Sequence, residues 1–310
     1  MPFPLASIPD PLFERLRQLT TPSELLRIQL AAPKIDKLGP LQYYWTTDAS
    51  MQLHEDKNGL AIGQMMVHDW PPAKYPIHER QLYNIAGSLF ILGTYFTGDT
   101  DFSVFNNWYL TPVCLKFSGC SMNLAGLKAF VKHFQGPIHD VQFIECSVAM
   151  EITLEKLFDI FPDATGLLMR YPMQQNWAQV LYDSTRRFQL LGIKPTVRQL
   201  DNLYKTDFLA YFKAQGPNFK LIFYFNEFEY YAHETEKAFK RLLGSSFERA
   251  DDVQQAPFIE IKGYNSTWKY KPRYKVDRTV EIAPQSTRPA RPNCFMRRCL
   301  TVIESCCCLQ

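Results

Sequence analysis

The chain has 310 residues, 46% of them hydrophobic, which is enough to fill one large core or two smaller ones. Its 34 basic and 31 acidic residues leave a net charge of +3, which excludes a strong overall field that would attract nucleic acid or an acidic partner. Asp10, Glu14 and Arg15 interrupt the first apolar residues, so we expect no secretory signal. These features predict a globular protein of the cytoplasm or nucleus.

The cysteines and the longest uncharged stretch also bear on the compartment. Cys114, Cys120 and Cys146 lie in apolar segments, and the other five cysteines crowd into residues 294–310, which favours reduced thiols over disulfides. The uncharged residues 81–98 are slightly too few for a bilayer span and include Gln and Asn. We therefore predict that this stretch forms buried strands.

Three short helices are predicted at the start of the chain. Asp10 is expected to cap a helix whose first position is Pro11. Residues 21–24 have the pattern of a capping box with proline at the first helical position, and Pro33 predicts a third helix that runs toward Leu38. The three helices carry more Leu and Ile than they can bury among themselves. Another surface must cover the excess.

These residues resemble the F-box family. Ile8-Pro9 stands where that family has a Leu-Pro pair, Lys34 matches the basic position of its third helix, and Phe3-Pro4-Leu5 is similar to the nematode branch. Ala32 departs from the small polar residue usual there. The resemblance implies a helical module, residues 1–42, that binds a Skp-family adaptor and, through it, a cullin. The residues expected to bind the adaptor are Ile8, Pro9, Leu12, Phe13, Leu16, Leu19, Pro22, Leu25, Leu26 and Ile28. The alternative is an ordinary helical hairpin that packs on its own domain.

Residues 43–112 are predicted to be a β-rich connecting segment. Residues 43–54 and 60–68 flank an Asn-Gly pair at positions 58 and 59, and Asn-Gly between apolar runs is the strongest short signal for a hairpin. We therefore predict a β-hairpin here.

Residues 113–276 alternate short apolar strands with amphipathic helices. Helices are expected at 124–131, 154–161 and 177–181. Each strand-helix unit has a face that it cannot bury alone, and stacked units would close it. The predicted strand centres are Leu115, Gln142, Leu168, Gln189, Ile222 and Ile259.

The predicted fold class is therefore α+β: a three-helix module, a β-rich segment and an irregular leucine-rich-repeat-like α/β region that binds a target. The strict L-x-x-L-x-L-x-x-N pattern is missing, which leaves a compact α/β sheet as the alternative. The region also resembles the F-box-associated or FTH-type domains of nematode F-box proteins.

Chemical motifs are scarce. No phosphate-binding loop, nucleophile elbow or zinc-binding helix pattern occurs, so we expect neither an enzyme nor a cofactor nor a small-molecule substrate. His133, His139, Asp140 and Cys146 do not form the close ligand pairs of structural zinc, so no metal is expected. The basic and aromatic residues 268–275 would suit an edge strand as well as nucleic acid, and we favour the strand.

A second aromatic cluster occupies residues 223–231. Core packing on both faces of a strand is the favoured interpretation, and a partner-binding surface is the alternative.

Residues 277–310 are predicted to be a flexible, basic, Cys-rich tail. The last four residues fit the C-a-a-X pattern, in which Cys307 would carry the lipid. One prenyl chain binds a membrane only marginally, so Arg297, Arg298 or acylated cysteines would have to add to it. An unmodified tail is the favoured interpretation, and peripheral membrane association is the alternative.

The resemblance and the predicted repeats together indicate the substrate-recognition subunit of an SCF-type, cullin-based ubiquitin ligase. Its partners would be the Skp-family adaptor, the cullin and an unknown target protein. The alternative is a solenoid interaction or scaffold protein unconnected with ubiquitin, tethered to a membrane if the C-terminus is prenylated.

Overall fold

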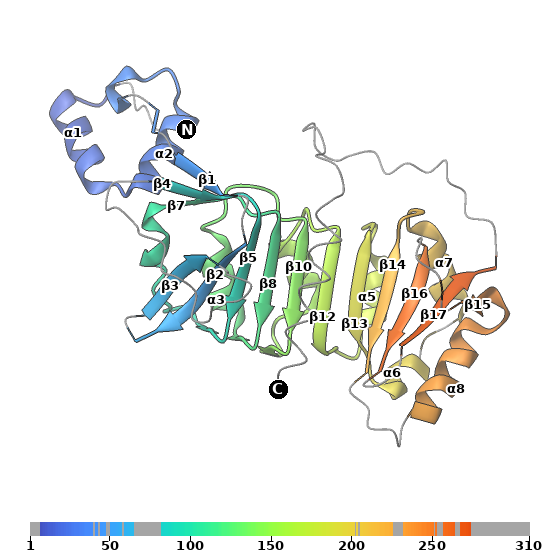
Figure 1. Cartoon of the computed structure of the whole chain (residues 1–310). Coiled ribbons are helices and arrows are strands. Elements are labelled where there is room, and N and C mark those ends of the chain that lie inside the picture. Colours follow the sequence, from blue (N-terminus) through green and yellow to red (C-terminus); the bar gives the residue numbers. More distant parts are fainter. Residues whose placement is uncertain are drawn as a thin grey trace. The chain divides into compact units, whose positions relative to one another are not determined.

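The structure is a computed structural model, and its described residues lie between Ser7 and Arg273. The fold is mixed α+β, with short helices at the amino end and one large sheet (Figure 1). The structure describes residues 7–39, 41–42, 44–47, 50–57, 59–64, 82–201, 203, 205–225, 232–250, 252, 257–263 and 267–273.

The amino-terminal module contains helices α1 (Asp10–Leu19) and α2 (Pro22–Ala31) and the 3-10 helix η2 (Asp36–Leu38). The predicted cap of α1 was wrong by one position, because Asp10 lies inside the helix and Pro9 precedes it without a side-chain cap. The third element is only a 3-10 turn. Ala32 has no side-chain oxygen to start a longer helix, and Gly39 with its φ of 77° follows η2 directly.

The capping box of α2 is confirmed. The Thr21 hydroxyl accepts a hydrogen bond from the Glu24 amide at 3.3 Å, and the Glu24 carboxylate accepts one from the Thr21 amide at 2.9 Å. Two amides that the helix itself leaves without acceptors are thereby satisfied. The sequence therefore determines the start of α2.

An eleven-stranded sheet dominates the fold. The strands from β2 to β16 pair in parallel, and antiparallel strands occupy both edges, with β3 at one and β17 and β15 at the other. In spatial order the strands are β3 (Gly59–Gln64), β2 (Met51–Asp56), β5 (Ser88–Leu92), β8 (Cys114–Ser118), β10 (Asp140–Ile144), β12 (Gly166–Pro172), β13 (Leu190–Lys194), β14 (Lys220–Tyr224), β16 (Phe258–Lys262), β17 (Thr267–Pro272) and β15 (Phe247–Arg249).

Two smaller parallel sheets flank the large one. The strands of one small sheet come just before successive strands of the large sheet, and the strands of the other come just after them. The chain therefore repeats the same order of strands in successive turns. One contains β1 (Tyr44–Thr47), β4 (Leu82–Ile85) and β7 (Trp108–Leu110), and the other contains β6 (Tyr95–Phe96), β9 (Ser121–Met122) and β11 (Ser147–Val148).

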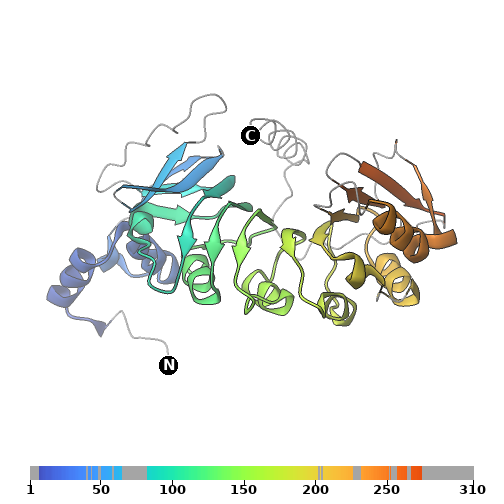
Figure 2. The same ribbon diagram turned by 90° about the horizontal axis from the view of Figure 1, so that it is seen from below.

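Helices connect the strands from β8 onward, and Figure 2 shows them on one face of the sheet. The expected helices at 124–131, 154–161 and 177–181 are confirmed, and five of the six expected strand centres lie inside strands, Gln189 falling one residue before β13. The helices after β8 are α3 (Leu124–Val131), α4 (Leu154–Ile160), α5 (Trp177–Asp183), α6 (Val197–Asp201), α7 (Lys205–Ala214) and α8 (Ala232–Leu243).

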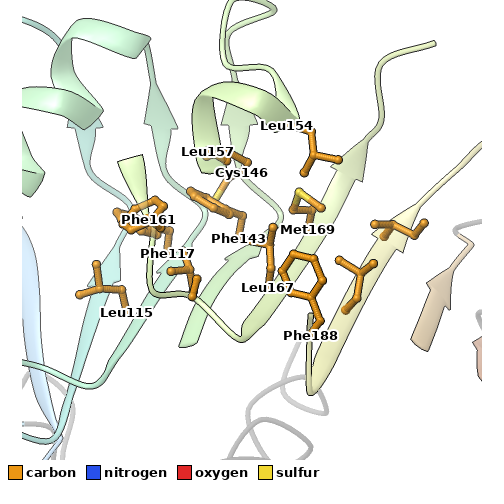
Figure 3. Packing of buried hydrophobic residues seen from close by; sticks show 14 of the residues in the cluster. Leu115, Phe117, Phe143, Cys146, Leu154, Leu157, Phe161, Leu167, Met169 and Phe188 are labelled. Atoms are coloured by element: carbon orange, nitrogen blue, oxygen red, sulfur yellow. The ribbon is translucent and has the colours of Figure 1, made fainter. Parts of the chain in front are cut away.

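The parallel strands pair with a regular period. Leu89, Leu115, Val141 and Leu167 are register partners at intervals of 26 residues, and their side chains are at most 2% exposed. Alternation places the residue two positions later on the same, helix-covered side. Side chains of that second row are drawn in Figure 3. The Phe117 ring stacks on the Phe143 ring of β10, with 4.9 Å between the ring centroids.

The β-rich segment joins this sheet directly. The hairpin is confirmed as β2 and β3, with Asp56 paired to Gly59, whose φ of 105° suits glycine. Residues 43–54, predicted as one strand, instead contribute β1 and β2 to two different sheets. Because β5 pairs with β8, the boundary that we placed at residue 113 does not divide the sheet.

The uncharged stretch forms strands, as predicted: β4 and β5 are almost wholly buried. Within the described ranges, no helix has both the length and the apolarity to cross a membrane.

Candidate functional site

The amino-terminal module exposes leucine side chains that a globular core would normally cover. Leu12 and Leu19 on α1 are 60% and 66% exposed, and Leu30 and Leu41 are 48% and 55% exposed. Leu12, Leu16 and Leu19 follow one another at helical spacing along one face of α1, and Leu16 is half-buried. We call this row the α1 leucine face.

Each helical element of the module buries one large apolar side chain. Phe13, Leu26 and Leu38, one from each helical element, are at most 2% exposed. They do not belong to the large cluster that fills the rest of the chain. Burying three such side chains stabilises the module by roughly 1.5 to 3 kcal/mol each.

Polar contacts tie η2 and the following residues to the two helices. The Lys37 ammonium lies 2.6 Å from the Asp10 carboxylate and 6.0 Å from the centroid of the Phe13 ring. The buried Gln29 side chain donates to the Leu38 carbonyl at 3.1 Å and accepts from the Gln42 amide at 3.0 Å. These contacts fix the turn after α2 against the helix that precedes it.

Helix α2 also contacts the rest of the chain. It lies against η3 (Ser103–Asn107) and β7, and the Arg27 guanidinium donates to the His133 carbonyl at 3.2 Å. Burial, and secondarily the charge of Arg27, lower the pKa of the His133 imidazole. Part of the apolar excess that we assigned to a partner is therefore covered by the chain itself.

The ten residues expected to bind an adaptor separate into three groups. Phe13 and Leu26 are buried; Ile8, Leu16, Pro22, Leu25 and Ile28 are half-buried; and Pro9, Leu12 and Leu19 are exposed. Among these ten residues, the exposed group lies on α1 and just before it. Leu30 on α2 and Leu41 after η2 are exposed as well, although neither was among the residues expected to bind the adaptor.

The other residues singled out in the sequence have structural roles where they are described. The basic-aromatic strip forms β17, which is not an edge strand because it pairs with β16 on one side and β15 on the other. Its residues alternate as a strand requires: Tyr270 belongs to the main core, and Trp268 packs against it. Phe223 and Phe225 are also core residues. Cys307 lies outside the described residues, as do residues 226–231 and 274–310.

The described histidines and cysteines form no metal site. Among the described residues, no group of three His, Cys, Asp or Glu side chains is placed to hold a metal ion. Cys114, Cys120 and Cys146 are buried and are not joined in disulfides with one another.

Comparison of the chain with family models, with curated proteins and with solved structures gave no match.

Proposed function

We propose that this chain is the substrate-recognition subunit of an SCF-type ubiquitin ligase. In this proposal the amino-terminal module binds a Skp-family adaptor, which links it to a cullin, and the repeated strand-helix region holds a target protein. The chain itself performs no chemistry. It places a lysine of the target near the ubiquitin-loaded enzyme and so raises the effective concentration of the two reactants.

The α1 leucine face is the observation that carries this proposal. Leu12 and Leu19 remain more than half exposed although the same helix buries Phe13. The helix is therefore packed on one side, and the two leucines lie on its uncovered side. An apolar row on a short helix is typical of a surface that a partner covers. Together with the Ile8-Pro9 pair and the capping box of α2, it favours the F-box interpretation.

The regular parallel sheet supports the second half of the proposal. A leucine-rich-repeat-like or F-box-associated region is our finer interpretation of the 26-residue period between β5 and β12. Such arrays offer a wide surface of constant curvature, which suits the binding of a protein better than that of a small molecule.

One observation favours the alternative, a scaffold protein unconnected with ubiquitin. Contacts of α2 with η3 and β7, together with the bond from Arg27 to His133, are what a helical hairpin that caps its own domain would make. A capping hairpin would still need a reason to expose Leu12 and Leu19, which this alternative does not supply.

Immunoprecipitation of the full-length tagged chain from eukaryotic cells tests the proposal. We expect a Skp-family adaptor and a cullin in the precipitate in comparable amounts. Recovery of neither protein, from a chain that is folded by circular dichroism, would favour the scaffold interpretation. Intact mass spectrometry of the same sample shows whether Cys307 carries a prenyl group.

A further inference from the structure

The face of the large sheet opposite the helices carries a cluster of cations that the sequence does not reveal. Arg170, Lys194, Lys220 and Lys262 belong to four neighbouring strands, β12, β13, β14 and β16, and each is half-buried. Successive side chains of a strand point to opposite faces of the sheet. Each of these four cations is next to a residue that faces the helices, so all four lie on the opposite face. We call this cluster the cationic face.

An apolar floor lies between these cations. Leu168, Leu190, Ile222 and Tyr224 form a buried cluster that is separate from the main core. Gly192 is the register partner of Leu168 and Ile222, and a Cβ atom added there would overlap the side chains of Leu168 and Tyr224. Glycine therefore lets these two side chains close the floor.

Cationic side chains lie over two aromatic rings on this face of the sheet, one in the apolar floor and one beside it. The Arg170 guanidinium lies 5.1 Å from the centroid of the Tyr224 ring, and the Lys220 ammonium lies 5.0 Å from that of Phe258. Lys269 approaches the Phe258 ring from the neighbouring strand at 5.8 Å. The rings are consequently not free to stack on nucleic-acid bases, and a partner meets the charged groups first.

Carboxylates are few in this cluster. Glu260 lies 3.7 Å from Lys262, and Glu145 is the acidic neighbour of Lys194. Burial, followed by the charge of Arg170, lowers the pKa of Lys194. Burial also lowers the pKa of Lys220. The charge of Glu260 works against this shift, and the charges of Lys262 and Lys269 add to it.

The pattern of charges is thus one of cations that repel one another. Their mutual repulsion, in partly desolvated positions, would be relieved by additional negative charge placed between them. The four strands span about 14 Å at the usual strand spacing, which equals the length of four to five extended residues.

We propose that the cationic face binds an acidic segment of a partner protein. This inference rests on the proposed function in one respect: it takes the partner that carries the acidic segment to be the target protein of the ligase. The amino-terminal module takes no part in it, so binding of the acidic segment and binding of the adaptor can fail separately.

The test uses the full-length chain and a fluorescent peptide of six glutamates around a central tyrosine. A peptide of the same length with lysines in place of the glutamates is the charge control, and a single-stranded RNA oligonucleotide tests the nucleic-acid alternative. We expect binding of the acidic peptide alone, weakened as the salt concentration rises.

Variants assign the binding to this face. Lys220→Glu with Lys262→Glu should weaken binding roughly tenfold or more, because two attractive pairs become repulsive. Glu260→Gln should tighten it, because it removes the competing carboxylate. The matched control is Lys128→Glu with Lys132→Glu, two exposed cations at α3 that give the same net charge and should leave affinity unchanged.

Three outcomes would overturn the proposal: no binding of the acidic peptide, equal weakening by the control double variant, or displacement of the peptide by RNA at lower concentration. If the Lys220 and Lys262 double variant is unfolded by circular dichroism, Lys262→Glu alone and Glu260→Gln decide, since the Lys262 side chain is 32% exposed. Adaptor binding should be the same in all of these variants.

Discussion

Replacement of Leu12 and Leu19 by alanine tests whether these side chains form a binding surface or part of the protein core. The side chains are 60% and 66% exposed, so a partner can still remove most of their surface from water. Each change deletes about three carbon groups at about 0.8 kcal/mol per buried group, and scaling by the exposed fraction leaves about 1.4 kcal/mol per residue. The two together should weaken adaptor binding about a hundredfold.

Stability should respond very differently. Alanine is the best helix former, and both side chains are largely exposed in the free chain. We therefore expect the double variant to unfold within about 0.5 kcal/mol of the parent. Phe13→Ala, which empties a buried position in the same helix, should instead destabilise the module by roughly 3 to 5 kcal/mol.

The assay is titration of the purified full-length variants with a recombinant Skp-family adaptor, accompanied by urea unfolding. Met150→Ala is the matched control, because Met150 is 88% exposed and lies between β11 and α4, outside the module. Unchanged adaptor affinity in the Leu12 and Leu19 double variant would refute the reasoning. A loss of stability above about 1 kcal/mol would also refute it, since the two leucines would then pack within the chain.

Three further predictions concern the fold. Thr21→Ala should cost about 1 kcal/mol by removing the cap of α2, measured as faster amide hydrogen exchange in α2 alone; uniform acceleration along the chain would contradict this. Phe143→Ala should cost roughly 3 to 5 kcal/mol in urea unfolding, because the ring is wholly buried in the second row of the sheet; a loss below about 1 kcal/mol would argue against the packing. Burial raises the pKa of Asp140, which Lys116 and His139 partly oppose, so its ionisation costs stability as the pH rises above about 4. Asp140→Asn should therefore gain stability relative to the parent between pH 4 and pH 7.5, and a constant difference would refute the assignment.

The strands and helices of the repeated region were predictable because their signals are local. The pairs Leu115 and Phe117, and Val141 and Phe143, alternate with less apolar residues as buried strands do, and turn or cap residues follow them. The full period was not recognised. The unit that begins with β5 is followed by the 3-10 helix η3 instead of an α-helix, so its sequence lacks the helical half of the pattern.

The sites were harder to predict than the fold. The apolar excess of the amino-terminal helices was visible, but the sequence did not show that α2 would contact η3 while α1 kept Leu12 and Leu19 exposed. The cationic face could not be seen at all. Arg170 and Lys262 are separated by most of the repeated region, and only the register of the parallel strands brings them onto one surface.

Calorimetric titration of the full-length chain with a recombinant Skp-family adaptor tests the central claim most directly. The account predicts a complex of one chain with one adaptor, a dissociation constant of about 1 μM or lower, and a negative heat-capacity change from buried apolar surface. An absence of binding heat at several temperatures, from a chain shown to be folded, would contradict it.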